Sequence, residues 1–572
     1  MIEFHPGFIL ILGGLLAPLV GKRLRQMVMV ITPLLALLAS LSLSVGTQWE
    51  YSFINEMQLV VLRADQLSLL FAVVFSMLTL LANIYALHLD RRGETMAAML
   101  YAGSSIGVVL AGDWLTLIVF WEIMAIASVF LIWNRRSPQA ISAGFRYILV
   151  HLLSGSLLLA GIFLQVSGGQ LEIISLTGSG GWSYWLILLG LGINSAFIPL
   201  HAWLPDAYPE ATITGSVFLC SFTTKTAVYC LIRLFPGTEL LIGVGLLMAL
   251  YGVIYAILEN DIRRLLSYHI IAQLGFMVVG VGLGSALGLN GAAAHAFNNI
   301  LYKSLLFMGA GAVIYATGYE KLTDLGGLYR KMPLTAVCFG IGALAISGVP
   351  LLNGFISKPL LTTAAAVQNL PAVELLLYLG SIGTFLSIAL KLNYFMFFGT
   401  DKGIKVQKIP TNMSVAMVGA TLLCVLYGLV PSLLYHRLPF VMDYAPYTFE
   451  HVISTLQLLL GTFIVFWLLR ARLIPHQAIS LDFDWFYRKP FATFIWWLVK
   501  MIGKFTKGCG VMCNAALNKV LPFSRNPVKW LPQTVEGPAP SVYNEDRYRV
   551  SVGVVVLMSV MIFVVTVFYA WL

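Results

Sequence analysis

Charged residues are scarce in this chain of 572 residues. Asp, Glu, Lys and Arg make up 10% of it, whereas hydrophobic residues make up 59%. Because soluble domains carry about 25% charged residues, this composition excludes a soluble protein of this length. The net charge of +10 would suit nucleic-acid binding in a soluble protein. Here the placement of basic residues between apolar runs explains it better, so we expect no nucleic-acid partner.

Cysteine is also sparse and shows no pairing framework. Four of the six cysteines lie in apolar runs, and the other two, Cys509 and Cys513, stand one helical turn apart. Without nearby histidines this pair is a weak metal signal, and ordinary helix packing explains it better. No glycine-rich phosphate loop follows a strand, and no haem or iron–sulfur spacing occurs. We therefore expect no metal, no cofactor and no redox chemistry in the chain itself.

Long apolar runs dominate the sequence instead. Since about 20 helical residues cross the hydrocarbon core of a bilayer, the runs predict about sixteen transmembrane helices. The fold class is therefore an all-α polytopic membrane protein. The first run, 8–20, is followed rather than preceded by basic residues. This order is wrong for a cleaved signal peptide, so we expect a retained first span.

The basic residues fall almost entirely in alternate loops. One set of alternate loops holds nearly all of these basic residues, from Lys22 and Arg23 near the N-terminus to Lys405 and Lys408 further along the chain. The other set holds only Arg63 and Arg437. Cytoplasmic loops carry the excess of Lys and Arg in membrane proteins. The N-terminus is therefore expected outside and the basic loops in the cytoplasm.

Two spans carry helix breakers at similar places. Pro199 interrupts the seventh span and Pro350 the twelfth, and each is followed by a span with a lysine and a nearby tyrosine. Interrupted helices expose backbone groups that can hold an ion, although ordinary proline kinks are an alternative. The offset predicts two inverted repeats of about five helices each.

The chain is accordingly divided into six parts. We expect N-terminal spans over 1–94, the first repeat over 95–258, the second repeat over 259–400, additional spans over 401–471, a lateral amphipathic helix with a linker over 472–549, and a final span over 550–572. In the fifth part, Pro490 is expected to open a helix whose apolar and lysine residues separate onto different faces. Such a helix lies along the cytoplasmic membrane surface, the alternative being a disordered basic tail.

Nine polar side chains interrupt the apolar runs. An ionised group at the bilayer centre costs about 2.5–3.5 kcal/mol on insertion scales, so such residues usually serve ion or proton movement. They are Glu122, His151, Lys225, His269, His295, Asn299, Lys303, Lys358 and Lys391.

These residue types suit proton transfer. Without a cationic partner, a buried Glu122 holds a proton, and a central lysine such as Lys225 can carry one. His295, Asn299 and Lys303 recur every four residues and so share one helix face, as a relay requires. His151 and His269 are alternatively packing histidines. Lys391 is alternatively a lysine whose ammonium reaches the interface from the end of its span.

Four segments together resemble one family. They are the run Pro199 to Ala207, which contains His201 and Asp206, the segment Gly112 to Glu122, the residues His295 to Lys303, and the run Ser347 to Lys358, which contains Pro350. They resemble the antiporter-like family, namely the proton-pumping subunits of respiratory complex I, the A and D subunits of Mrp sodium/proton antiporters, and membrane subunits of energy-converting hydrogenases. The similarity runs from about residue 65 to 400.

The resemblance implies a chain of protonatable residues along the membrane mid-plane. Glu122, Lys225, Lys303 and Lys358 match the family's glutamate in the fifth helix and its lysines in the eighth, eleventh and twelfth. It also implies neighbouring membrane subunits, another antiporter-like subunit among them, in the cell membrane of a prokaryote. The lateral helix and sixteenth span resemble the distal subunit of complex I.

One position departs from the family pattern. The family usually has a lysine five residues before the proline of the Pro-Leu-His motif, and Asn194 stands there instead. A neutral amide cannot hold Glu122 ionised. The first half-channel therefore uses another cation, works differently, or is silent.

Two functions follow from these patterns. The first is an ion-translocating subunit that moves protons, with sodium exchange as an option, inside a multi-subunit complex such as an NADH/quinone-type oxidoreductase. The second is a structural subunit that conducts little and clamps its neighbours through the lateral helix. Asn194 favours the second function, whereas Lys225, Lys303 and Lys358 favour the first.

Overall fold

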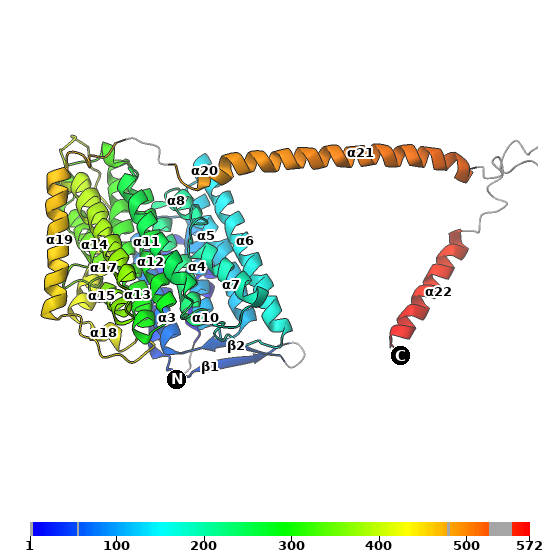
Figure 1. Cartoon of the computed structure of the whole chain (residues 1–572), viewed down its shortest axis with the longest axis horizontal. Coiled ribbons are helices and arrows are strands. Elements are labelled where there is room, and N and C mark those ends of the chain that lie inside the picture. Colours follow the sequence, from blue (N-terminus) through cyan, green and yellow to red (C-terminus); the bar gives the residue numbers. More distant parts are fainter. Residues whose placement is uncertain (1–3, 54–56, 477–480, 526–551, 572) are drawn as a thin grey trace, which may run out of the picture. The chain divides into compact units, whose positions relative to one another are not determined.

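The chain forms two compact units, Met1–Asp482 and Phe483–Leu572. The computed structural model describes residues 4–53, 57–476, 481–525 and 552–571. The first unit holds most of the helices, which run side by side as a bundle (Figure 1).

Within the described residues, eleven helices or helix pairs are long and apolar enough to cross a membrane. They are α2 (Lys22–Ser42), α3 (Gln66–Ala86), α5 (Trp114–Trp133), α6 (Pro138–Ser167), α9 (Ile213–Leu219) with α10 (Thr223–Leu234), α11 (Leu240–Leu258), α12 (Ile262–Leu283), α13 (Ala286–Thr317), α16 (Pro371–Thr384) with the π-helical η4 (Phe385–Leu392) and η5 (Tyr394–Phe398), α17 (Thr411–Leu429) and α19 (Phe449–Leu469). The structure is thus mostly helical, in agreement with the expected class of all-α polytopic membrane protein.

The remaining helices of this unit are shorter or less apolar. They are α1 (Pro6–Leu16), α4 (Arg92–Leu110), α7 (Gly181–Asn194), α8 (Trp203–Ala207), α14 (Pro333–Ser347), α15 (Lys358–Val367), α18 (Ser432–Tyr435), η2 (Leu322–Asp324) and η3 (Leu328–Arg330).

Side-chain caps fix where several helices begin. The Asp65 carboxylate accepts the Ser68 amide and the Ser68 hydroxyl accepts the Asp65 amide, which completes a capping box before α3. Asp113 and Ser285 cap α5 and α13 in the same general way. The sequence therefore marks these starts locally, before any tertiary contact.

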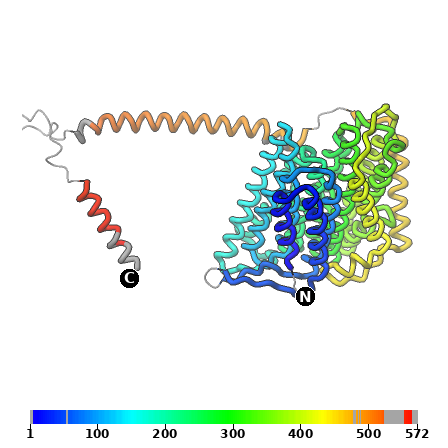
Figure 2. Tube along the Cα trace, turned by 180° about the vertical axis from the view of Figure 1, so that it is seen from behind, coloured from blue at the N-terminus to red at the C-terminus, as the bar shows by residue number. Residues whose placement is uncertain are grey.

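A short antiparallel hairpin, β1 (Gln48–Ser52) with β2 (Gln58–Arg63), was not predicted from the sequence. It lies at one end of the bundle, beside the N-terminus, in both views (Figures 1 and 2). Its second strand carries Val60 and Val61, a β-branched residue type that favours strands. The Val60 amide donates to Asp113 Oδ2, so the hairpin is tied to the start of α5.

The helices differ sharply in how far they are buried. The apolar core of α12 is wholly buried and that of α13 is 89% buried, whereas that of α19 is only 17% buried. Figures 1 and 2 accordingly place α19 at the edge of the bundle. Side chains on α12 and α13 are therefore shielded from lipid, as buried ionisable groups require.

The predicted breaks at Pro199 and Pro350 are confirmed. Helix α7 ends at Asn194 before α8 begins at Trp203, and α14 ends at Ser347 before α15 begins at Lys358. A third break, between α9 and α10, was missed because no proline marks it.

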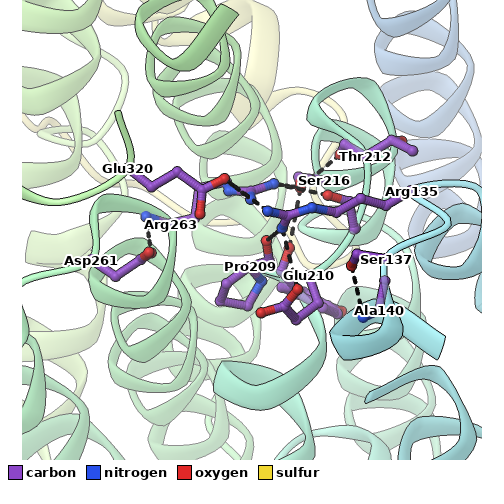
Figure 3. Close-up of polar contacts among 12 residues, drawn as sticks. Arg135, Ser137, Ala140, Pro209, Glu210, Thr212, Ser216, Asp261, Arg263 and Glu320 are labelled. Carbon is purple, nitrogen blue, oxygen red and sulfur yellow. Dashed lines mark hydrogen bonds and ion pairs between the residues drawn. The ribbon is translucent and has the colours of Figure 1, made fainter. Parts of the chain in front are cut away.

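An ion-pair network joins several loops at the end of the bundle that carries the basic residues (Figure 3). Arg263 donates to Glu320 Oε1 at 2.9 Å and to the Ala211 carbonyl at 2.9 Å. Arg135 donates to the same Glu320 oxygen at 3.0 Å and pairs with Glu210 at 3.3 Å. The loops after α5, α8 and α13 are thus fastened to the first turn of α12.

The second unit consists of helices alone among its described residues. They are α20 (Asp484–Phe486), the π-helical η6 (Tyr487–Phe491), α21 (Ala492–Arg525) and α22 (Val552–Trp571). Helical geometry already begins at Asp484, and Pro490 lies inside η6. The expectation that Pro490 opens the helix was therefore wrong, because the helix starts about two turns before it. The expected linker up to residue 549 lies mostly outside the described residues.

Asp261, which caps α12, generates a pH prediction. Burial raises the pKa of its carboxyl to about 6, against the opposing effects of Arg263 and the Arg264 amide. The folded state therefore binds more protons than the unfolded state between about pH 4 and 6, so the stability from this group falls as pH rises through that window. Asp261→Asn keeps the cap and removes the buried charge.

We expect Asp261→Asn to raise the detergent melting temperature at pH 7.5, by the equivalent of about 1 kcal/mol, and the gain to shrink towards pH 5. The control is Asp443→Asn, since Asp443 is exposed. A difference that stays constant from pH 5 to 8 would contradict the assignment.

Candidate functional site

Most of the predicted polar residues meet on a few neighbouring helices of the first unit. Helix α13 carries His295, Asn299 and Lys303, and α12 beside it carries His269. Lys225, Lys358 and Lys391 lie on α10, α15 and η4. Only Glu122 and His151 lie apart from these, on α5 and α6.

His295 is held on both sides of its ring. Its Nε2 lies 3.0 Å from Gln273 Oε1, and its Nδ1 lies 3.1 Å from Ser357 Oγ. Because the Gln273 oxygen only accepts, Nε2 donates, which leaves Nδ1 of a neutral ring to accept from Ser357. This links α13 to α12 and to the second broken helix.

Gln273 is the hub of this network, although the sequence did not single it out. Its Oε1 also accepts from the Tyr302 hydroxyl at 3.4 Å, and its Nε2 donates to Thr384 Oγ1 at 3.2 Å. The Asn299 amide donates to Tyr302 at 3.1 Å. From the sequence, only the occurrence of a glutamine within an otherwise apolar run could have indicated that position 273 is functional.

Two lysines deep in the bundle are held by backbone carbonyls. Lys303 Nζ donates to the Leu266 carbonyl at 3.0 Å, and Lys225 Nζ donates to the Cys220 carbonyl at 2.8 Å. Cys220 lies in the break between α9 and α10, which frees this carbonyl from the helix. Both lysines are fully buried, and neither pairs with a carboxylate among the residues described here. The two ammonium groups lie within electrostatic range of each other.

Lys358 borders a cavity of about 520 Å³ between α15, α16 and α19. Its side chain is 6% exposed, and its ammonium donates to Ser381 Oγ at 3.2 Å and stands 5.4 Å from the centre of the Phe276 ring. Glu374 and Glu450 also line the cavity. They stand in the first turns of α16 and α19, at the same end of the bundle, where a helix favours negative charge.

Lys391 lies at the opposite end of the network. Its ammonium donates to the Ile257 and Glu259 carbonyls, at 2.5 and 2.9 Å, where α11 ends. One turn earlier on η4, the Ser387 hydroxyl contacts His269 Nε2 at 2.7 Å. Lys391 is therefore anchored at a helix C-terminus, where a cation is favourable.

Glu122 and Asn194 lie on either side of α6. Glu122 packs against Gly155, where an added Cβ would stand 2.2 Å from its Oε1. It makes no ion pair or hydrogen bond to any described residue. The Asn194 amide donates to the neighbouring Ser154 and to the Gly190 carbonyl. Asn194 is thus a hydrogen-bonded core residue rather than a partner for Glu122.

His151 stacks on Tyr147 with ring centres 3.9 Å apart, and its Nδ1 bonds the Tyr147 carbonyl at 2.9 Å. Asp206, from the first broken helix, accepts two hydrogen bonds from Arg146, at 2.7 and 3.0 Å. Both contacts fasten α6 to its surroundings, as packing residues do.

His201, in the first break, contacts a residue that sequence reasoning missed. Its Nε2 lies 3.1 Å from Asp482 Oδ1, and the same carboxylate accepts from the Tyr251 hydroxyl and, at 2.6 Å, from the Tyr268 hydroxyl. Asp482 is only 4% exposed. Burial acts to raise the pKa of this carboxyl, but His201 and the two hydroxyls lower it well below its usual range.

Asp482→Asn tests this anchor. The amide cannot accept all three hydrogen bonds, so we expect the free energy of unfolding to fall by about 1–3 kcal/mol, seen as a lower melting temperature in detergent. Asp401→Asn, at an exposed ion pair with Lys331, is the control and should change little. Equal melting temperatures for both variants would show that the Asp482 contacts carry no stability.

Comparison with known proteins places these features in a family. Residues 111–387 match the family described as "NADH:quinone oxidoreductase/Mrp antiporter, TM". An uncharacterized protein of Methanocaldococcus jannaschii is 33% identical over 376 residues, which cover 61% of this chain and 76% of that protein.

Two other relatives carry descriptive names. Hydrogenase-4 component B of Escherichia coli is 29% identical, with 65% of this chain and 62% of the relative covered. The D component of the Na(+)/H(+) antiporter of Alkalihalophilus pseudofirmus is 32% identical, with 53% and 65% covered. The chain therefore spans less than two thirds of each of these two relatives.

Two solved structures share the fold. A chain of the Mrp complex from Dietzia sp. has a TM-score of 0.69 at 22% identity, covering 81% of this chain and 98% of its own length. A chain of an archaeal membrane-bound sulfane sulfur reductase has a TM-score of 0.71 at 22% identity, covering 98% and 99%. The chain belongs to the family of NADH:quinone oxidoreductase and Mrp antiporter transmembrane subunits.

Proposed function

We propose that this chain is an ion-translocating membrane subunit of a multi-subunit complex, and that protons move along its buried polar residues. Exchange of protons for sodium is compatible with the same residues. The observation that supports the proposal is the set of buried polar side chains on α10, α12, α13, α15 and η4, several of which are linked by hydrogen bonds.

The proposed route begins at the cytoplasmic end with Lys391. It continues through Ser387 and His269 towards Lys303, whose charge lies within electrostatic range of His269. Buried polar atoms that lack a protein partner, such as His269 Nδ1 and Asn299 Oδ1, are positions where water would join the route. Lys225 connects the first repeat to Lys303.

The route continues outwards through the second broken helix. Gln273, His295 and Ser357 form a continuous run of hydrogen bonds that leads to the residue beside Lys358. From Lys358 the cavity with Glu374 and Glu450 provides the outer opening. Glu122, His151 and the first break, with Asn194, Pro199, His201 and Asp206, form the corresponding but incomplete route of the first repeat.

Replacing Lys303 tests this function. We expect Lys303→Ala to slow proton transport by about tenfold or more in vesicles that carry the assembled complex, because the central ionisable group is lost. Lys303→Met keeps the volume of the side chain and should behave alike. Lys408→Ala, in an exposed loop, is the control and should transport normally. Unchanged transport in an assembled Lys303→Met complex would overturn the proposal.

The finer architecture supports the same proposal. We propose sixteen spans: the eleven already named, together with α1, α4, α7 with α8, α14 with α15, and α22. The inverted repeats would be 95–258 and 259–400, flanked by spans over 1–94 and 401–471 and by the final span over 550–572. The breaks at Pro199 and Pro350, each preceding a span with a buried lysine, support the repeats.

The remaining part, 472–549, would hold a lateral helix on the cytoplasmic membrane surface. Helix α21 is long, with many exposed aromatic and aliphatic side chains besides its lysines. The similarity to the sulfane sulfur reductase chain covers nearly the whole sequence, including this part. We further propose that the N-terminus lies outside and that the partners are other membrane subunits, another antiporter-like chain among them, in a prokaryotic cell membrane.

A structural, weakly conducting subunit is the second candidate. The observation that favours it is the unpaired Glu122, since Asn194 bonds Ser154 instead of supplying a cation. If this candidate is correct, Lys303→Met leaves transport unchanged, while deletion of α21 and α22 dissociates the complex on a native gel. In either case the redox reaction of the complex, where one exists, would belong to other subunits.

A further inference from the structure

We propose that a pocket at the cytoplasmic end of α19 binds the phosphate head group of an anionic phospholipid. The pocket has a volume of about 380 Å³ and lies between the end of α19, the end of η5 and the loop that follows α13. None of the residues of the proposed ion route lines it. The inference therefore rests on the proposed orientation of the chain, with this end in the cytoplasm, but not on whether the chain transports ions.

The pocket adjoins a close backbone contact. Gly326 and Gly327 press against the loop at 400–401, where an added Cβ would stand 2.2 Å from the Thr400 carbonyl oxygen and 2.6 Å from the Asp401 Cα. Gly327 also has a positive φ of 66°, which favours glycine. The two loops thus meet without side chains between them, next to Leu325 and Thr400, which line the pocket.

Two cations stand in the wall of the pocket. The Lys402 ammonium donates to the carbonyl of Thr323, another residue that lines the pocket, which fixes the ammonium beside it. The Arg470 guanidinium stands 4.1 Å from the centre of the Trp467 ring, a cation–π contact that orients it. No Asp or Glu is among the described residues that line the pocket, and the nearby Asp401 pairs with Lys331. The wall therefore presents net positive charge to a ligand.

The surroundings of the pocket are apolar, as an acyl chain requires. Ile464, Trp467 and Leu468 on the last turns of α19 are 50%, 48% and 75% exposed. Helix α19 lies at the edge of the bundle in both views (Figures 1 and 2), so these side chains face lipid in a membrane. Phe395 and Ile474 continue the apolar surface into the pocket itself.

These features together favour a lipid over free phosphate. Basic pockets between spans on the cytoplasmic side bind the head groups of anionic lipids, because that leaflet carries negative charge. The lipid would bridge Arg470 on α19 to Lys402 beside η5. It would thereby attach a helix that buries little of its own surface in the bundle.

The test uses the full-length protein in detergent and phosphatidylglycerol as the probe. Wild type should retain phosphatidylglycerol in native mass spectrometry and melt at a higher temperature with it than with phosphatidylcholine. The double variant Lys402→Gln/Arg470→Gln should weaken this binding by about tenfold or more, because each basic group near the surface attracts anionic lipid.

The matched control is Lys405→Gln/Lys408→Gln, which also removes two positive charges, both from the loop that holds Lys402, but leaves the residues that line the pocket unchanged. It should bind like wild type, and Lys402→Arg/Arg470→Lys should retain binding, which separates lost charge from misfolding. Equal losses in the Gln pair and its control would overturn the proposal in favour of general surface attraction. Full protection by inorganic phosphate alone, or equal binding of phosphatidylcholine, would overturn it as well.

Discussion

The lysines inside this bundle are held by neutral oxygen atoms. Carbonyls of Cys220 and Leu266 accept from Lys225 and Lys303, and the Ser381 hydroxyl accepts from Lys358. A carboxylate partner would stabilise the charged lysine strongly and fix its protonation state. A carbonyl or hydroxyl stabilises it less, so the charged and neutral forms remain closer in free energy. The break between α9 and α10 supplies one of these carbonyls, that of Cys220, whereas the Leu266 carbonyl belongs to the first turns of α12.

The two ends of the bundle are built differently. At the end with the basic loops, Arg135 and Arg263 share Glu320 and join several loops to one another. At the opposite end, α15, α16 and α19 leave a cavity that reaches Lys358. The ion-pair network at one end and the cavity beside Lys358 at the other make the two ends of the bundle chemically different, which a symmetric pair of repeats alone would not do.

Local chemistry made part of this structure predictable. Proline lacks an amide hydrogen, so Pro199 and Pro350 marked two breaks, and the four-residue spacing placed His295, Asn299 and Lys303 on one helix face. The third break has no such mark. There the Tyr101 hydroxyl, from another helix, accepts the Thr223 amide, so a tertiary contact fixes the start of α10. Gln273, Ser357 and Asp482 were missed for the same reason, since their roles depend on partners far away in the sequence.

The π-helical segment η4 has a consequence for how the chain tolerates length changes. A π turn contains one residue more than an α turn, so it arises where one residue has been accommodated without moving the flanking helix. Loss of a single residue from 385–392 would restore α geometry there and leave the flanking turns in place, while residues inside the bulge would shift by one position, about 100° around the helix axis. Lys391 would then leave the carbonyls at the end of α11 while the span kept almost its full length. The extra residue of the π turn therefore determines where the Lys391 ammonium lies, and a substitution elsewhere in the helix could not place it there.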